Sequence, residues 1–294
     1  MNVLHAAVVL LLALWSTAAC AAERGIGIFT IVDGDARVLR KTTWYRLEAG
    51  AHAEPGDVLD VSEHAQVQIE LPRGTAISAP GPALAYLPEA RADAKTSPPF
   101  MLMRGWIKAA NAAKAPPLRL DLPTSALRVD DGIVVVHCDA MHTEFFVESG
   151  RASLLTPAPR GKEQARDAAE GEYWHRTGDR AFETDDRPSQ AFIAAMPHAL
   201  RDRLPALASH FEGTPPALPA GREITFVEAE PWLSGPARRT FARRFAARLS
   251  DPAFRSAAAA HNVPEWDRTL HPERYKPRDA DPAASPQPFL KRQP

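Results

Sequence analysis

The sequence predicts a mainly β domain followed by a smaller α-helical C-terminal region. Between Gly25 and about Arg176, apolar and polar residues alternate in short runs separated by turn residues, which is the pattern of half-buried strands. After Ser189 the apolar residues recur at helical spacing. The chain also has 28 prolines among 294 residues, which favours many turns and short strands over long helical bundles.

Three runs carry the clearest strand signal. The runs Val67–Leu71 and Leu118–Leu122 alternate without a fault, so each should bury one face and leave the other in solvent. The run Ile133–Val136 is continuously β-branched, which suits a strand buried on both faces. Glycine tolerates positive φ, so turns are predicted between strands at Asp33-Gly34, Pro55-Gly56-Asp57, Arg73-Gly74, Asp131-Gly132 and Ser149-Gly150.

Two helices are predicted in the C-terminal half, over Ser189–His210 and Gly235–Ala260. Ser234 is expected to cap the second helix, and Asp251-Pro252 marks a break into a further short helix. The large aromatics of this half are expected to pack in a core, with ligand stacking as the alternative: Phe226, Trp232, Phe254 and Trp266. Residues 264–266, followed by 272–275, are expected to form an extended segment laid back over the fold.

The second helix carries an arginine cluster at 238, 239, 243, 244 and 248. At 100° per residue, Arg239 and Arg243 lie opposite Phe241, while Arg244 and Arg248 flank the apolar stripe. This arrangement predicts a solvated face with arginine stems covering apolar surface, and a protein- or envelope-binding surface is the alternative.

Overall composition excludes two classes of protein. Hydrophobic residues make up 45% of the chain, so it can bury a core and is not a disordered polymer. The 35 lysines and arginines balance 36 aspartates and glutamates, giving a formal net charge of -1. No bulk positive field would hold such a protein on nucleic acid, so no nucleic-acid partner is expected.

The N-terminus has the pattern of an export signal. Residues Ala6–Trp15 form an apolar run that is shorter than the roughly 20 residues needed to span a bilayer, and small residues follow it. Residues 1–21 are therefore expected to be a signal peptide cleaved between Ala21 and Ala22, which makes the mature protein periplasmic. An uncleaved anchor or an apolar N-terminal strand is the alternative.

Cys20 leaves a further alternative open. Residues Thr17–Cys20 form a partial lipobox in which Thr replaces the usual Leu, so membrane attachment is expected only if Cys20 is lipidated. With cleavage after Ala21, Cys138 remains as a single cysteine and no intramolecular disulfide can form.

Short motifs follow one another in a fixed order between residues 25 and 156: Gly34–Val38, Leu47–Gly50, Pro55–Leu59 with its Gly-Asp turn, Val67–Leu71 with Gly74, Arg104-Gly105, Thr124–Ile133 and Val147–Ala152. In this order they resemble the FecR-like domain, a family found in extracytoplasmic proteins and in transmembrane regulators of iron-citrate signalling. The resemblance implies an all-β, solenoid-like or sandwich-like domain that contacts other proteins or envelope components and carries no catalytic residues. Signalling members begin with a cytoplasmic segment that binds a sigma factor, followed by a transmembrane helix. This chain begins with an export signal, so sigma-factor regulation is not expected.

The expected organisation has four parts: a signal peptide at 1–21, a FecR-like β domain at 22–187 with loops at 88–99 and 157–170, a helical region at 188–275, and a disordered tail at 276–294.

One cluster has residue types suited to catalysis or metal binding. His137, Cys138 and His142 are ligand types for zinc or copper, and a thiol beside an imidazole could act as nucleophile and base. Neighbouring residues on a strand point to opposite faces, so His137 and Cys138 meet only if the strand breaks there. We therefore expect a structural cysteine, and no catalytic, cofactor-binding or metal-binding residues.

These observations predict an exported, non-enzymatic binding, scaffold or signalling-accessory module of the bacterial cell envelope, with an envelope or periplasmic protein as partner and no cofactor. The alternative is a metal-dependent or thiol hydrolase that acts on envelope material through His137, Cys138 and His142.

Overall fold

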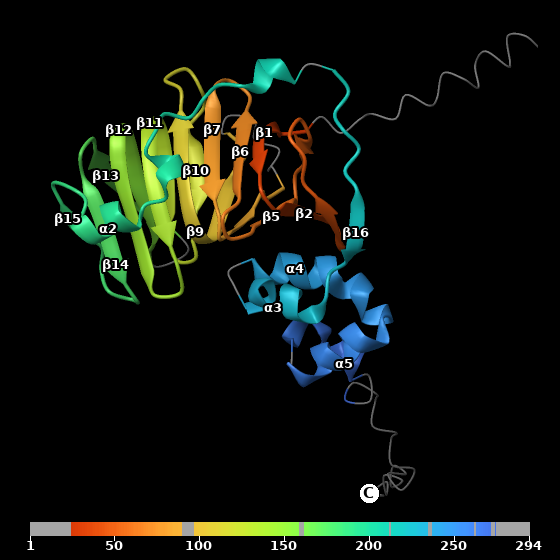
Figure 1. Cartoon of the computed structure of the whole chain (residues 1–294). Helices are drawn as coiled ribbons and strands as arrows, with labels where there is room; N and C mark the ends of the chain where they lie inside the picture. The colour runs from red at the N-terminus through yellow and green to blue at the C-terminus, as the bar shows by residue number, and fades with distance from the viewer. Residues whose placement is uncertain are drawn as a thin grey trace, which may run out of the picture. The chain divides into compact units, whose positions relative to one another are not determined.

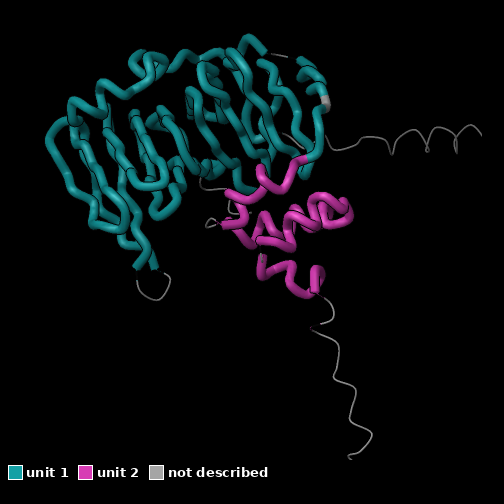
Figure 2. The backbone as a smooth tube through the Cα atoms, turned by 60° about the horizontal axis from the view of Figure 1, so that its bottom comes forward, with its two compact units in different colours: residues 1–223 teal, residues 224–294 magenta. Residues whose placement is uncertain are grey.

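The structure is a computed structural model that describes residues 25–89, 97–158, 162–211, 213–234, 237–261, 263–271 and 274. The predicted signal peptide at 1–21, with Cys20, and the predicted tail at 276–294 lie outside these ranges. The chain divides into two compact units, Met1–Glu223 and Ile224–Pro294 (Figure 2). The predicted fold class is confirmed, because the first unit is built of strands and the second of helices.

Unit 1 is a two-layered β structure (Figure 1). Its strands are β1 (Gly27–Asp33), β2 (Ala36–Arg40), β3 (Thr43–Arg46), β4 (His52–Ala53), β5 (Val58–Val61), β6 (Gln66–Leu71), β7 (Thr75–Pro80), β8 (Ala83–Tyr86), β9 (Phe100–Asn111), β10 (Leu118–Asp121), β11 (Ala126–Cys138), β12 (His142–Pro157), β13 (Glu163–Ala169), β14 (Tyr173–Thr177), β15 (Glu183–Asp185) and β16 (Ala220–Glu223). Layer A pairs them in the order β4-β1-β6-β7-β9-β11-β12-β14-β15. Layer B has the order β16-β3-β2-β5-β8-β9-β10-β11-β12-β13, in which only β9 and β10 run parallel.

Three long strands, β9, β11 and β12, belong to both layers. Each contains a glycine with positive φ: Gly105 at 104°, Gly132 at 102° and Gly150 at 78°. Gly132 and Gly150 pair directly, and a Cβ on Gly132 would lie 2.0 Å from a carbonyl oxygen of β12. The turns predicted at Asp131-Gly132 and Ser149-Gly150 are therefore wrong, because the strands bend there and stay in the ladder. Only glycine permits this backbone conformation so close to a neighbouring chain.

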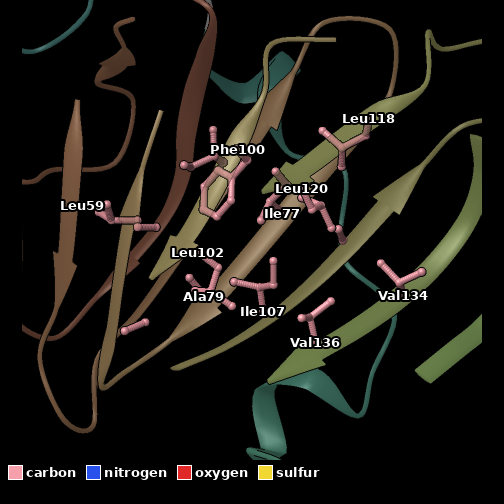
Figure 3. Packing of buried hydrophobic residues seen from close by; sticks show 14 of the residues in the cluster. Leu59, Ile77, Ala79, Phe100, Leu102, Ile107, Leu118, Leu120, Val134 and Val136 are labelled. Carbon is pink, nitrogen blue, oxygen red and sulfur yellow. The ribbon is translucent and has the colours of Figure 1, made fainter. Parts of the chain in front are cut away.

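One hydrophobic core fills the space between the two layers. Figure 3 shows part of it, with residues of layer A and layer B side by side: Leu59, Ile77, Ala79, Phe100, Leu102, Ile107, Leu118, Leu120, Val134 and Val136. The strands predicted at Val67–Leu71 and Leu118–Leu122 are confirmed as β6 and β10, and their apolar positions face this core. The predicted strand Ile133–Val136 lies within β11, with Val134, Val135 and Val136 all buried.

The Gly-Asp turn at Pro55–Asp57 has a structural role. The Asp57 carboxylate accepts a hydrogen bond from the Glu54 backbone N–H at 2.9 Å, and the Arg40 guanidinium donates to it at 3.1 and 3.2 Å. Burial raises the pKa of Asp57 to about 6, against the opposing influence of Arg40. This motif residue therefore ties β2 to the turn that precedes β5.

The segment 157–170, predicted as a surface loop, contains strand β13 paired antiparallel with β12. All residues of β13 except Ala168 are exposed, so the strand has no apolar alternation to reveal it in the sequence. In the predicted loop 88–99, the described residues 88–89 and 97–99 have no regular structure.

Unit 2 consists of α3 (Phe226–Ser234), α4 (Arg238–Phe245), α5 (Pro252–Ala260) and α6 (Asp267–Leu270), with 3-10 turns η4 (Ala246–Ser250) and η5 (Pro264–Trp266). The predicted break at Asp251-Pro252 is confirmed, because the Asp251 carboxylate accepts the first N–H groups of α5. Ser234 does not cap α4; it ends α3, and its hydroxyl donates to the Glu230 carbonyl. The segment 264–266 is a 3-10 turn and not extended.

The aromatic residues of unit 2 form its core, as predicted: Phe226, Trp232, Phe254 and Trp266 are all buried. The arginine prediction also holds. Arg239 and Arg243 are exposed, whereas the Arg248 guanidinium lies 5.5 Å from the centroid of the Phe254 ring. None of the helices in the described ranges combines the length and apolar character that crossing a membrane requires.

The helix predicted over Ser189–His210 is wrong for most of its length. Only α2 (Gln190–Ala195) is α-helical, followed by 3-10 turns η2 (His198–Leu200) and η3 (Ala208–His210). Pro197 and Pro205 lack the N–H groups that a continuous helix needs. Residues 188–211, which we call the strap, instead cross layer A, and β16 then pairs with β3 in layer B. The boundary expected after residue 187 therefore lies at Glu223.

Candidate functional site

The outward face of layer A carries a row of polar side chains that have no access to water. The register pairs Gln68 with Ser78, and Ser78 with Lys108. All three side chains are fully buried, and each alternates with residues of the core, so they point away from it. The solvated polar face predicted for Val67–Leu71 is therefore wrong at Gln68, because the strap covers it.

The strap buries two of its own side chains on this face. The Phe192 ring centroid lies 4.9 Å from that of Trp106 and 5.1 Å from that of Tyr173. Leu200 belongs to the same small hydrophobic cluster, together with Val135 of β11. This cluster is separate from the main core and lies on the opposite side of layer A, beneath α2 and η2. In Figure 1 the teal segment leads from α2 to β16.

Beyond Leu200, the sheet holds the strap by its main chain. The Lys108 ammonium donates to the carbonyl oxygens of Leu200 at 3.0 Å and Asp202 at 2.9 Å. Farther along, the Gln68 amide donates to the Pro205 carbonyl at 2.8 Å. The Glu70 carboxylate then accepts the backbone N–H groups of the next turn, from Leu207 at 2.7 Å and Ala208 at 3.1 Å. Five contacts thus address backbone atoms and are independent of the strap's side chains.

The buried ammonium of this face has a charged partner, whereas one buried acceptor has no hydrogen-bond donor among the described residues. The buried Lys108 ammonium forms an ion pair with Glu148 of β12 at 2.7 Å, which offsets the cost of removing the charge from water. The Gln68 side chain donates to Thr30, Glu70 and the strap, but its Oε1 is buried and has no hydrogen-bond partner among the described residues. The strap therefore leaves one acceptor of this face unused.

A polar network occupies the end of the face near β14. Glu144 lies between His137, whose Nδ1 is 3.1 Å from Oε2, and Tyr173, whose hydroxyl donates to Oε1 at 2.8 Å. The hydrogen bond with His137 is the largest of the effects that lower the pKa of Glu144. Burial raises the pKa of Tyr173, so its hydroxyl stays protonated. His137 also stacks on Trp106, with ring centroids 4.5 Å apart.

The structure does not bring His137, Cys138 and His142 together. Cys138 lies in the core and its thiol is 3.7 Å from the Leu102 carbonyl oxygen, whereas His137 lies on the outward face. Burial raises the pKa of the Cys138 thiol to about 12. His142 is at the start of β12, where its Nδ1 is 3.2 Å from Asp139. In the described ranges, no three His, Cys, Asp or Glu side chains are placed to share a metal ion.

Sequence reasoning missed the strap-covered face. The burial of Gln68 and Lys108 could not be predicted, because a polar residue in an alternating strand gives the same sequence pattern whether water or another segment covers it. One signal was present: the prolines at 197 and 205 interrupt the predicted helix of the strap, and an irregular segment of that kind runs over the surface of other elements.

Comparison with known proteins identifies no family for this chain. No protein-family model matches the sequence, and no curated protein matches it. Two crystal structures of a proposed anti-sigma factor from Parabacteroides distasonis ATCC 8503 align with a TM-score of 0.39 and 12% identity. The alignments cover 47% of this chain and 63% and 64% of the solved chains, so under two thirds of each neighbour is matched. A TM-score below 0.5 says nothing about what this chain binds.

Proposed function

We propose that this protein is exported to the periplasm and acts there as a non-enzymatic module that binds another polypeptide. The apolar run at residues 6–15 supports export, and the order of motifs that resembles FecR-like domains supports a binding role. One observation carries the proposal. Lys108, Gln68 and Glu70 all direct their polar atoms at the main chain of a crossing segment, so this face holds a polypeptide through groups that every polypeptide has.

The residues that could have supported catalysis have contacts typical of structural roles. A thiol with a pKa near 12 is protonated at neutral pH, so Cys138 is no nucleophile. Glu144 is hydrogen bonded to both His137 and Tyr173, and this network fixes the aromatic cluster beneath α2. On the strap-covered face, by contrast, three polar side chains are arranged around the main chain of another segment.

Export is tested by cell fractionation together with the mass of the mature N-terminus. We expect the protein in the periplasmic fraction with Ala22 as its first residue. A diacylglyceryl group on Cys20 would instead show a lipoprotein. Intact protein with Met1 in the cytosol would contradict the proposal.

Binding is tested by photo-crosslinking in cells. A benzoylphenylalanine at His175, which lies on the outward face of layer A next to Tyr173, should yield a discrete adduct with one protein. The matched control is the same substitution at Arg128, which lies on the outward face of layer B and should yield none. Equal labelling at both positions, or no adduct at His175, would refute a partner site on layer A.

A further inference from the structure

We infer that the strap is a built-in stand-in for the partner, and that the face beneath it takes a polypeptide segment that, like the strap, carries an aromatic side chain and a leucine eight residues apart in short helical turns. This inference rests on the proposed function and names the partner's chemistry. The strap provides the pattern, because Phe192 and Leu200 are its only buried residues.

The contacts of the face suit a polypeptide other than the strap. Lys108, Gln68 and Glu70 bind carbonyl and N–H groups that every polypeptide has, so the selection of side chains depends on the apolar contacts around Phe192 and Leu200. The aromatic anchor packs against Trp106 and Tyr173, whose ring centroids lie 4.9 and 5.1 Å from that of Phe192.

The strap is held less firmly than the sheet that it covers. Two buried side chains, half-buried ones such as Met196 and a few main-chain contacts must offset the chain entropy lost by ordering the whole of residues 188–211. Its second half, from Arg201 to His210, has no buried side chain at all. The strap is connected to β15 at one end and to β16 at the other, so it can leave the face as a loop while every strand stays paired.

The face also has binding capacity that the strap does not use. Gln68 Oε1 is buried without a hydrogen-bond donor among the described residues. A partner segment that places a backbone N–H against this oxygen gains a contact that the strap lacks. Weakening the strap's own anchors should favour the partner further. The apparent affinity of the partner rises with the fraction of molecules in which the strap has left the face.

The test uses the full chain and a fluorescent synthetic peptide with the sequence Ser189–His210. We expect weak binding to the unaltered protein and binding about tenfold tighter or more to the variant Phe192→Ala/Leu200→Ala. Adding Lys108→Met to this variant should abolish the gain. A control peptide with alanine at the positions of Phe192 and Leu200 should not bind. Unchanged affinity in the double variant, or equal binding of the control peptide, would overturn the inference.

Two readouts keep the test decisive. If the double variant loses its near-UV circular dichroism, and so its native packing, hydrogen exchange on the unaltered chain replaces the binding test. Amides of the strap should then exchange at least about tenfold faster than those of β9 and β11. Equal protection of the strap and the two strands overturns the inference. Peptide binding without any in-cell adduct at His175 would refute the proposed function but not the stand-in. A crosslinked adduct at His175 that an excess of the strap peptide does not reduce would refute the inference that the strap occupies the partner's site, but not the proposed function.

Discussion

The variant Lys108→Met tests whether a buried ammonium fastens the strap to layer A. It removes two hydrogen bonds to strap carbonyls and the ion pair with Glu148. Breaking a buried ion pair by removing one partner costs about 3–5 kcal/mol. The Glu148 side chain is 36% exposed and can regain water, so we expect the lower end, about 3 kcal/mol. Methionine keeps most of the volume of the lysine stem, so cavity formation adds little.

The loss should appear first in the strap. Hydrogen exchange should show faster exchange at amides of residues 198–208, while amides of β9 and β11 keep their protection. Urea unfolding measures the change in the free energy of unfolding. The control is Lys114→Met, at an exposed position, which should change that free energy by less than about 0.5 kcal/mol. If Lys108→Met behaves like Lys114→Met in both measurements, the ammonium does not anchor the strap.

Further substitutions test other parts of unit 1 and unit 2. Gly132→Ala should lower the free energy of unfolding in urea by about 2–5 kcal/mol, because the new Cβ combines a positive φ with a distance of 2.0 Å to a carbonyl oxygen. The control Gly171→Ala has a positive φ but open space around the Cβ, so it should cost only about 1–2 kcal/mol. Equal losses in the two variants would contradict the close approach at Gly132. Asp57 has a folded pKa of about 6, above its usual value of 3.8, so the folded state binds the extra proton and stability should fall as pH rises from about 4 to 6. The fall is up to about 3 kcal/mol and should vanish in Asp57→Asn; a slope that survives the substitution would show that another group causes it. Asp251→Ala should cost about 1 kcal/mol in thermal unfolding, since α5 loses its cap, and an unchanged midpoint would count against that role.

Local patterns in the sequence predicted the parts of the fold that depend on neighbouring residues. Alternation in Val67–Leu71 predicted β6, and Asp251-Pro252 predicted the start of α5, because both signals act within a few residues. A glycine in a bend and a glycine in a turn look alike, so Gly132 and Gly150 were assigned to turns. β13 was missed because an edge strand with one buried residue has no periodicity.

The candidate site could not be predicted for a related reason. Lys108 and Gln68 contact strap residues that lie 92 and 137 positions later in the chain, and no local pattern reports such a contact. The strap's course depends on where β15 ends and where β16 pairs, which only the assembled sheet determines. In contrast, the separation of His137 from Cys138 followed directly from strand alternation and is confirmed.

The bends at Gly105, Gly132 and Gly150 have a consequence for how unit 1 melts. Because β9, β11 and β12 each pass through both layers, neither layer can lose its pairing and leave the other intact. The sheets should therefore denature together in one cooperative transition. The strap contacts one layer and forms no strand pairing with either, so it can detach while the rest of unit 1 remains native.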